Sequence, residues 1–454
     1  MSRRAKLSAP VEEASVAALT HDGEGIVRAG KTAFVGGALP GELIRFRRIR
    51  RHRSHDEGQL LEVLGRSPDR VTPRCAHFGV CGGCALQHLS ADRQLEIKQL
   101  QLRDALERVA KATPDTWLEP PRGPQWGYRR RARLGARYVP KKGRVVVGFR
   151  ERLAPYIAAL EQCEVLAPPV GALIGPLSGL LTAMTTREHI PQIEVAIADN
   201  VTALVFRVLE PLPEGDIAAL REFAAQHRLR IYLQPGGVAS VAPLDTGSDT
   251  QPLRYSLPEF GVTFDFAPTD FVQINAAINQ AMVSRVISLL ELTAGSRVLD
   301  LYCGLGNFTL PLARRAASVL GIEADAALIE RARHNARVNG FTNAQFVAAD
   351  LTQPLPVNAP YLASGFSHLV LDPPRAGAME VMPTIAHLAP RKVAYISCHP
   401  GSLARDIGVL VHEFGFALRS AGVLDMFPHT AHVESLAVLT PPEGAKVRRS
   451  GCKS

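Results

Sequence analysis

The stretch from residue 271 to 441 constrains the fold of this chain most, because short apolar runs alternate there with runs of helical period. Five apolar runs have the length and composition of buried strands: Arg297–Leu301, Ser318–Ile322, Gln345–Ala348, His368–Leu371 and Val393–Ser397. Strands that alternate with helices form a parallel sheet. We therefore predict a doubly wound, Rossmann-like α/β domain, which binds its ligands at the carboxyl ends of the strands.

A glycine-containing loop follows the first of these strands and reads Asp300-Leu-Tyr-Cys-Gly-Leu-Gly-Asn-Phe308. Gly304 and Gly306 let the backbone turn sharply and approach a ligand closely, while Cys303 is predicted to pack. Glu323 ends the next strand, about twenty residues on, where a carboxylate can accept hydrogen bonds from ribose hydroxyls. Because the loop lacks the G-x-G-x-x-G spacing that suits a dinucleotide, S-adenosylmethionine (SAM) is the favoured ligand.

The fourth strand ends in an acidic motif, Asp372-Pro-Pro-Arg375. The carboxylate of Asp372 can stabilise a nearby sulfonium or accept a hydrogen bond from the imide N–H of a base. The same motif occurs in enzymes that methylate amines, and an aspartate before two prolines can also simply cap a turn. Asp372 by itself therefore does not distinguish carbon methylation from nitrogen methylation.

The fifth strand ends in a cysteine, Cys398, within Ser397-Cys-His-Pro400. A thiolate that adds to carbon 6 of uracil makes carbon 5 nucleophilic enough to take a methyl group. We expect the helix predicted just after this motif to lower the thiol pKa. Glu434 is the favoured base for removing the carbon 5 proton, ahead of His429 and His432. A buried cysteine that only packs is the alternative interpretation.

Three of the seven cysteines lie within ten residues, spaced Cys-x5-Cys-x2-Cys, at Cys75, Cys81 and Cys84. The others are dispersed, which does not suit a disulfide framework, and no secretory signal is seen, so we expect a reducing, cytoplasmic setting. Thiolates at this spacing indicate a metal centre, with Cys163 as a fourth ligand. The spacing favours a 4Fe–4S cluster over a zinc site completed by His77 or His88.

Residues 11 to 67 contain short apolar runs separated by glycine-rich turns, which is typical of a small β-barrel of the OB type. One run, Glu42–Arg53, alternates basic and apolar residues, which predicts that Ile44, Phe46 and Ile49 face inward. A solvated edge strand has the same pattern. The density of arginines and the net charge of +9 favour a surface that binds RNA.

These patterns divide the chain into a basic tail (1–10), the barrel (11–68), a central α+β region (69–270), the SAM domain (271–441) and a polar tail (442–454). Residues 91–112 have helical spacing. Trp126–Arg133 interleaves aromatic residues with arginines, which suits unpaired RNA as well as a solvated basic strand. Val165–Met184 is uncharged and long enough to span a bilayer, but its prolines and glycines predict a loop followed by a helix of a soluble domain.

These motifs, in this order, resemble the bacterial RNA (uracil-5-)-methyltransferases over residues 11–440, above all those that act on 23S ribosomal RNA. In that family the N-terminal barrel is a TRAM domain, the cysteines hold a 4Fe–4S cluster and the last domain is Rossmann-like. The resemblance implies Cys398 as nucleophile, Glu434 as base, and four cluster ligands: Cys75, Cys81, Cys84 and Cys163. It implies a SAM pocket formed by Gln273, Tyr302, Asn307, Glu323, Asp350 and Asp372.

The resemblance also places Phe271 and Arg133 near a uracil that is flipped out of its stack. His399 stands where the family usually has asparagine, and Asp350 stands where the family varies. Members that act on tRNA generally lack the barrel and the cysteine cluster. The resemblance therefore implies SAM-dependent methylation of carbon 5 of one 23S rRNA uridine. We expect a monomer that acts on RNA, with no DNA or membrane partner. The alternatives are another rRNA or tRNA uridine, and amine methylation of RNA with Cys398 only packing.

Overall fold

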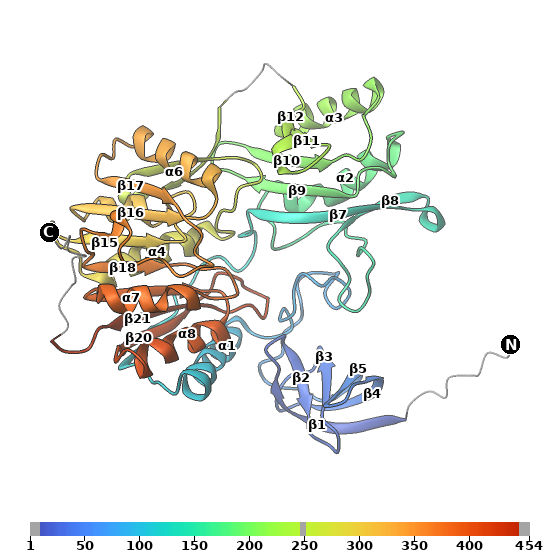
Figure 1. Ribbon diagram of the computed structural model, residues 1–454. Helices are drawn as coiled ribbons and strands as arrows, with labels where there is room; N and C mark the ends of the chain where they lie inside the picture. Colours follow the sequence, from blue (N-terminus) through green and yellow to red (C-terminus); the bar gives the residue numbers. More distant parts are fainter. Residues whose placement is uncertain (1–9, 246–250, 445–454) are drawn as a thin grey trace. The chain divides into compact units, whose positions relative to one another are not determined.

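The computed structural model describes residues 10–245 and 251–444, which form two compact units (Figure 1). The first unit contains the described chain up to Lys98, together with Phe149–Ala158 and Phe427–His432. The second contains Gln99–Gly148, Ala159–Met426 and the chain from Val433 onward. The predicted tails, with Cys452, lie almost wholly outside the described residues.

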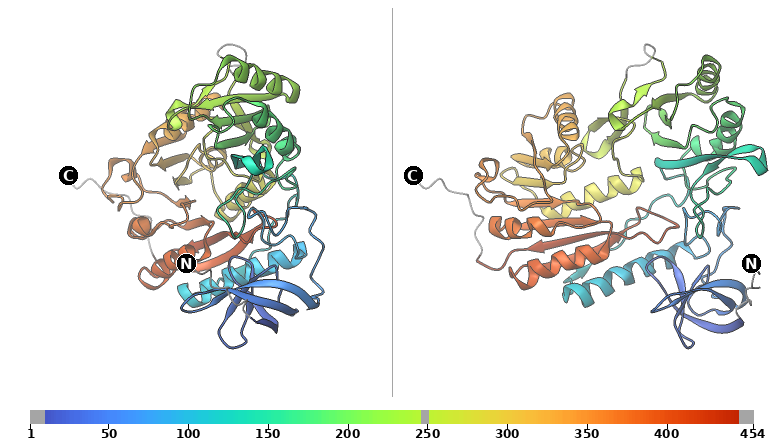
Figure 2. Two further views of the ribbon diagram at one scale, coloured as in Figure 1. Left: turned by 90° about the vertical axis from the view of Figure 1, so that its right-hand side faces the viewer. Right: turned by 45° about the vertical axis from the view of Figure 1, so that its right-hand side comes forward.

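The first unit contains a closed barrel of five strands, drawn in blue in Figure 2, in the order β1-β2-β3-β5-β4. The strands are β1 (Val11–Leu19), β2 (Glu24–Val27), β3 (Ala33–Gly36), β4 (Leu43–Arg51) and β5 (Asp56–Gly65). Strand β4 pairs antiparallel with both β5 and β1, which closes the barrel. Apolar side chains fill its interior, among them Val16, Val27, Val35 and Phe46. The predicted N-terminal barrel is confirmed.

One of the three residues of β4 that were predicted to face the interior of the barrel does not. Ile44 and Phe46 are fully buried, whereas Ile49 is 48% exposed. The pairing of β4 with β5 shifts register between Arg48 and Arg50, so Ile49 is an additional residue on β4. Such a β-bulge interrupts the alternation of the strand, and the residue it adds no longer points into the barrel.

Turns and isolated bridges form residues 66–90, and a helix follows them. Helix α1 (Ala91–Ala105) continues into one π-helical turn, η1 (Leu106–Ala110), so the predicted helix at 91–112 is confirmed apart from its end. Leu102 and Leu106 are fully buried, but Leu100 and Val109 are about half exposed. Lys111 adopts a left-handed conformation, with φ of 48°, and ends the helix.

The second unit contains a mixed sheet of six strands in the order β12-β11-β10-β9-β7-β8. Its strands are β7 (Arg131–Val139), β8 (Arg144–Gly148), β9 (Gln192–Ile197), β10 (Thr202–Arg207), β11 (Leu229–Gln234) and β12 (Ala242–Pro243). Helices α2 (Val170–Ala183) and α3 (Glu214–His227) belong to the same region, and a hairpin of β13 (Leu253–Leu257) and β14 (Val262–Phe266) follows it. Across the described part of the chain, no helix is both long and apolar enough to span a membrane.

A second sheet of this unit has eight strands in the order β17-β16-β15-β18-β19-β21-β20-β6. These are β17 (Ala344–Ala348), β16 (Ser318–Glu323), β15 (Arg297–Leu301), β18 (His368–Leu371), β19 (Lys392–Ser397), β21 (Glu434–Thr440), β20 (Ala417–Leu424) and β6 (Thr116–Trp117). The first five are mutually parallel and β21 runs antiparallel to its neighbours. The predicted Rossmann-like domain is confirmed, and its five strands match the predicted runs to within one residue at each end.

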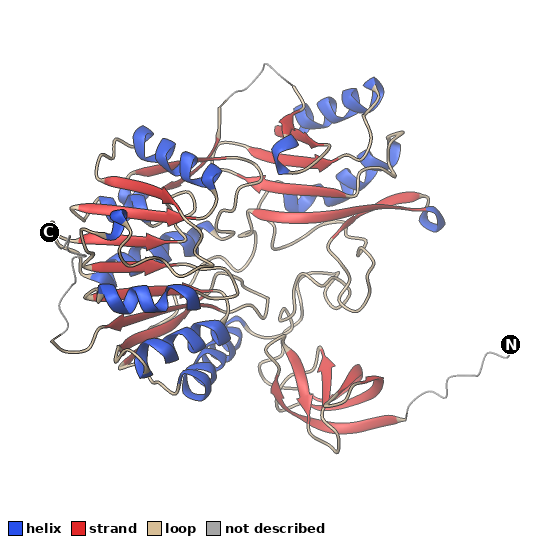
Figure 3. Ribbon diagram, in the orientation of Figure 1, coloured by secondary structure: helices blue, strands red, loops and turns tan. Residues whose placement is uncertain are grey.

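Helices alternate with these strands along the chain, as Figure 3 shows in blue and red. They are α4 (Ala276–Leu290), α5 (Thr309–Ala313), α6 (Ala326–Val338), α7 (Met382–Leu388) and α8 (Pro400–His412). Short 3-10 turns lie at Pro140–Lys142, Val238–Ser240, Pro258–Phe260, Pro360–Leu362 and Met379–Val381. Strand β6 was not predicted, because two residues carry no periodic signal; it pairs in parallel with β20 and completes the edge of the sheet.

Candidate active site

The carboxyl ends of four parallel strands and the start of β21 meet at one edge of the eight-stranded sheet. Strands β16, β15, β18 and β19 lie side by side in register, so the residues that follow them come together. Ser397 of β19 pairs with Ser435 of the antiparallel β21, and this register sets Cys398 opposite Glu434. Asp372 follows the neighbouring β18 directly. The sequence-predicted nucleophile, base and acidic residue therefore lie at one place.

The loop after β15 holds a strained backbone. Tyr302 has φ of 62°, a left-handed conformation that side chains rarely adopt, and Gly304 and Gly306 have φ of 52° and 90°. Such strain persists where the surrounding structure enforces it, which is common at ligand sites. The amide of Gly304 donates to Oε2 of Glu323 (3.2 Å), whose Oε1 accepts from the amide of Ala324 (2.7 Å). The Glu323 carboxylate is thus held in place beside the loop.

Two amide side chains connect this loop to the start of α4. Asn307 and Asn279 form a reciprocal pair of hydrogen bonds of 3.0 and 2.9 Å, and the hydroxyl of Tyr255 also donates to Asn307 Oδ1 (3.2 Å). The Gln273 amide donates to Oδ2 of Asp372 at 3.3 Å. Gln273, Asn279 and Tyr255 line a pocket together with eight other residues: Arg130, Ile197, Asp199, Ser256, Phe266, Val272, Ala276 and Gln280.

Three carboxyl groups of the site have raised pKa values. Burial raises the pKa of Asp300 to about 7, against a hydrogen bond from the Thr309 hydroxyl (2.5 Å) that lowers it. Burial also raises the pKa of Asp372 to about 7, and burial together with Asp372 raises that of Glu434. The buried Oδ1 of Asp300 has no hydrogen-bond partner among the described residues. A site of this kind favours a positively charged ligand.

The expected lowering of the Cys398 pKa is wrong. Burial, then the nearby carboxyl groups of Glu434 and Asp372, raise the pKa of the thiol, and the smaller opposing effect of Arg375 does not offset them. Helix α8 does begin at Pro400, and the side chain of His399 caps it by accepting from the amide of Ser402 (3.1 Å). The helix terminus is therefore present, but burial together with the carboxyl groups of Glu434 and Asp372 leaves the pKa of the thiol raised.

A second network, missed by sequence reasoning, fixes the loop after Asp372. Asp406 is fully buried on α8, and its Oδ2 accepts from the hydroxyl of Tyr395 (2.6 Å) and from the amide of Ala378 (2.7 Å). The Arg405 guanidinium donates to the carbonyl of Ala376 (2.9 Å). The sequence did contain a signal for this network, because Asp406 lies between Leu403 and Ile407 on the apolar face of its helix. A charged residue there predicts a buried partner.

The remaining predicted residues are placed as follows. Cys303 is 5% exposed, so the packing prediction is confirmed. Asp350 accepts from the amide and hydroxyl of Thr352, which lower its pKa. Phe271 is 71% exposed just before α4. Arg133 pairs with Glu194 (2.8 Å), and within the described residues no hydrogen bond or ion pair links it to those around Cys398.

The residues predicted as alternative bases or as metal ligands are distributed over both units of the structure. His429 and His432 lie in the first unit, where His429 Nδ1 is 3.3 Å from Gln94 Nε2. Cys75, Cys81 and Cys84 lie on the loop at 71–90 of that unit, and Cys163 lies in the second unit. No disulfide joins any cysteine between residues 10 and 444. In the ranges that the structure describes, no three His, Cys, Asp or Glu side chains are placed to hold a metal ion.

Known proteins share both the sequence and the fold of this chain. Residues 257–441 match the family described as tRNA (Uracil-5-)-methyltransferase. The 23S rRNA (uracil(1939)-C(5))-methyltransferase RlmD of Alkalilimnicola ehrlichii is 48% identical over 96% of this chain and 98% of its own length. The protein of the same name from Xanthomonas axonopodis pv. citri is 49% identical over 94% of this chain and 96% of its own.

A solved structure agrees with these sequence relatives. The tRNA (uracil-54, C5)-methyltransferase of Pyrococcus abyssi, crystallised with S-adenosyl-L-homocysteine, superposes with a TM-score of 0.72 at 25% identity. The match covers 94% of this chain and all of that one. Almost half of the residues are identical to those of these relatives over nearly the whole length of both chains, and Cys398, Asp372 and Glu434 lie together at the strand ends. The chain therefore belongs to the family of SAM-dependent RNA (uracil-5-)-methyltransferases.

Proposed function

We propose that this enzyme methylates carbon 5 of one uridine of 23S rRNA, the uracil numbered 1939 in the names of its relatives, through a covalent adduct with Cys398. The observation that carries this proposal is the register of β19 and β21, which sets Cys398 opposite Glu434 beside Asp372. The near-complete coverage of relatives with this activity in their names supports the substrate. We propose that the barrel is the TRAM domain and that 69–270 and 271–441 are the central and catalytic domains.

The residues present fit SAM. The negative potential of Asp300, Asp372 and Glu434 suits a sulfonium, and the fixed carboxylate of Glu323 suits ribose hydroxyls. Gln273, Tyr302, Asn307 and Asp350 complete the proposed pocket. When bound, SAM supplies an electrophilic methyl group. Because its charge is positive, its presence is expected to lower the raised pKa values of the site and so favour the thiolate of Cys398.

We propose that the chemistry then follows from the two facing residues. Sγ of Cys398 gives up its proton to solvent and bonds to carbon 6 of the uracil, and the electron pair of the 5,6 double bond moves into an enolate through carbon 5. Carbon 5 would take the methyl group of SAM, whose bond from sulfur to that methyl breaks with its electron pair staying on the sulfur. The Glu434 carboxylate removes the proton from carbon 5, and the bond from carbon 6 to sulfur breaks with its electron pair returning to sulfur. Asp372, which accepts a hydrogen bond from the Gln273 side-chain amide, is proposed to orient the uracil edge, and Phe271 and Arg133 are proposed to hold the flipped nucleotide.

We also propose that Cys75, Cys81, Cys84 and Cys163 hold a 4Fe–4S cluster. The support is the chemistry of the donors: three thiols on one glycine-containing loop, none of them in a disulfide within the described chain. Methyl transfer needs no electron, so the cluster is proposed to stabilise the RNA-binding part. Purification without oxygen should give bound iron and sulfide with visible absorbance, and Cys81→Ser should lose both. A chain purified in this way without iron would contradict the proposal.

The covalent mechanism is tested with a 23S rRNA fragment that carries 5-fluorouridine. Fluorine at carbon 5 cannot leave as a proton, so the adduct should persist on denaturing gels and map to Cys398 by peptide analysis. Cys398→Ser should abolish it, whereas Cys303→Ser, which changes a buried cysteine of the SAM loop, is the matched control. Methyl transfer to RNA without a crosslink would overturn the covalent mechanism and favour amine methylation through Asp372-Pro-Pro-Arg375.

A further inference from the structure

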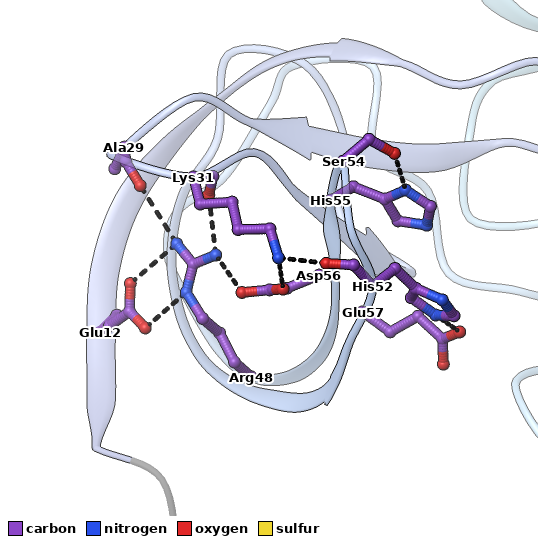
Figure 4. A network of polar contacts seen from close by, with 9 residues as sticks. All are labelled: Glu12, Ala29, Lys31, Arg48, His52, Ser54, His55, Asp56 and Glu57. Atoms are coloured by element: carbon purple, nitrogen blue, oxygen red, sulfur yellow. Dashed lines mark hydrogen bonds and ion pairs between the residues drawn. The ribbon is translucent and has the colours of Figure 1, made fainter.

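Two arginines within β4, Arg45 and Arg48, do not belong to the free basic surface that the sequence pattern indicates. Arg45 pairs with Glu13 (2.7 Å) and Glu62 (2.6 Å). The side chain of Arg48 is only 13% exposed and pairs with Glu12 (2.8 Å) and Asp56 (3.0 Å), as Figure 4 shows. Ion pairs on the barrel thus neutralise these guanidinium groups, and a polyanion has little to gain from them.

The turn between β4 and β5 presents a different surface. The ring of His55 stacks between two others, with its centroid 4.5 Å from that of Phe34 and 4.6 Å from that of His52. The planes deviate by only 24° and 20°. Since His55 is in the middle, the stack ends on His52, whose side chain keeps 37% exposure. Three rings therefore form a short column at the surface of the barrel.

Polar contacts hold this column in place (Figure 4). The amide of His52 donates to the carbonyl of His55 (2.9 Å), which closes the turn, and Lys31 donates to the carbonyl of His52. Nε2 of His52 lies 2.7 Å from Glu57, and Nδ1 of His55 lies 3.2 Å from the Ser54 hydroxyl. A ring that is fixed before binding loses little entropy when a partner stacks on it.

Free cations flank the column. Arg51 and Arg53 are exposed, and within the described residues neither guanidinium has a hydrogen-bond or ion-pair partner. A fixed aromatic face with free arginines beside it suits a nucleotide whose base stacks and whose phosphate pairs with a guanidinium. The base must be unpaired, because a helix of RNA offers no exposed base face.

We propose that the stack of Phe34, His55 and His52, together with Arg51 and Arg53, is a docking platform for one unpaired nucleotide of the RNA substrate, separate from the uridine that is methylated. This inference rests on the proposed function only in taking RNA as the substrate. The platform contributes to affinity and register, and it leaves the chemistry at Cys398 unchanged.

The test uses the full-length enzyme and a 23S rRNA fragment that contains the target uridine in an unpaired segment. His55→Ala should weaken the Kd for this RNA by roughly 5- to 150-fold, the range for loss of one base–aromatic stack, with a parallel rise in KM and an unchanged kcat. His55→Phe should restore binding, since it keeps the stack without the ring nitrogens. His21→Ala is the matched control, because His21 is an exposed histidine on another loop of the barrel.

A second variant tests the charge. Arg53→Gln should reduce the slope of log Kd against log salt concentration by about 0.7, as expected for one lost phosphate contact to a single strand. The platform is overturned if His55→Ala binds RNA as tightly as His21→Ala, or if His55→Phe binds as weakly as His55→Ala. Wild-type enzyme that binds the RNA but does not methylate it would instead contradict the proposed function, since the binding comparison stands without turnover.

Discussion

The thiol of Cys398 is half-buried beside two carboxyl groups, and its partial burial and these neighbours raise its pKa. Removing the negative charge of Asp372 should lower the thiol pKa, because the pKa of Asp372 is about 7 and the group is largely ionised at pH 8. We expect Asp372→Asn to speed alkylation of Cys398 by iodoacetamide at pH 8 by a few-fold to tenfold. The rate is followed by peptide mapping of the unliganded enzyme.

Asp350→Asn is the control for this experiment, because Asp350 is not among the groups that shift the pKa of Cys398. Alkylation of the Asp372→Asn enzyme at or below the wild-type rate would show that Asp372 does not act on the thiol.

The role proposed for Glu434 makes a separate prediction. Glu434→Gln removes the base but keeps the shape of the side chain, so methyl transfer to carbon 5 can proceed while elimination cannot. We expect turnover to fall by about 10²- to 10⁴-fold and a methylated RNA–protein adduct to accumulate on natural RNA. Gel shifts under denaturing conditions detect it. Glu443→Gln, at an exposed position beyond the end of β21, should turn over normally. Rapid turnover without an adduct would assign the base to another group.

Which individual residues could be predicted depends on where their neighbours come from. Cys398, Asp372 and Glu323 were found because residues after parallel strands meet at one edge of a sheet, and strand ends can be recognised locally. The pKa of Cys398 was predicted in the wrong direction, because burial and the carboxyl groups of Glu434 and Asp372 raise it, and the sequence shows neither how deeply the thiol is buried nor how near these groups lie. Ile49 was misplaced for a similar reason: a bulge is a property of two paired strands.

At the scale of elements, helix α8 holds the loop after β18 through Asp406. Gly377 lies in that loop with φ of 88°, and a Cβ there would lie 2.6 Å from Asp406 Oδ2 and 2.7 Å from Arg405 Nη2. We expect Gly377→Ala to displace the loop that carries Asp372. Its unfolding free energy should fall by about 1–3 kcal/mol more than that of the control described below, since the added methyl overpacks the contact. Its kcat should fall by about 10²-fold.

Gly340→Ala separates backbone strain from crowding. Gly340 also has positive φ, of 73°, but a Cβ there would meet nothing within 4 Å. Gly340→Ala should lower the free energy of unfolding by about 1–2 kcal/mol through backbone strain alone and leave kcat unchanged. Thermal unfolding and steady-state kinetics of both variants provide the comparison. Equal effects on kcat would mean that the loop does not depend on Asp406.

Helices and strands whose own residues repeat with a hydrophobic period could be predicted. Elements that form only by pairing with a distant strand could not. The strands of the SAM domain and helix α8 agree with the sequence pattern because each carries several turns or alternations of apolar residues. Strand β6 has only Thr116 and Trp117, and its pairing with β20 joins positions about 300 residues apart. No local pattern contains that information.

At the scale of the whole molecule, the buried carboxyl groups make stability depend on pH. The pKa of Asp300 is raised from 3.8 to about 7, so its ionised form is disfavoured in the folded state. The resulting cost is absent below about pH 4, grows as pH rises, and is constant above about pH 7, where it is on the order of 4 kcal/mol. We expect Asp300→Asn to be progressively more stable than wild type, in relative terms, between pH 4.5 and 7.5. Thermal unfolding without ligand measures this.

Asp216 provides a control for this experiment, because its pKa is shifted in the opposite direction to that of Asp300. Hydrogen bonds from Thr185 and Thr186 lower its pKa in spite of burial, so its stabilising contribution is complete above pH 4 and is lost only as pH falls further. Asp216→Asn should therefore be destabilised by the same amount throughout pH 4.5 to 7.5. A parallel pH profile for wild type and Asp300→Asn would show that Asp300 is not held with a raised pKa.

Helix α1 and its π-helical turn have a consequence for synthesis on the ribosome. Leu102, Leu106 and Ala110 pack in one core with residues of α8, Leu403 and Ile407 among them. These two parts of the core are translated about 300 residues apart, which at 5–20 residues per second is roughly 15–60 s. During that interval the nascent chain has an apolar helix face, because the residues of α8 that pack on it have not yet been translated. We therefore expect the nascent chain to be most open to chaperone binding near residue 105, far upstream of the domain that the helix completes.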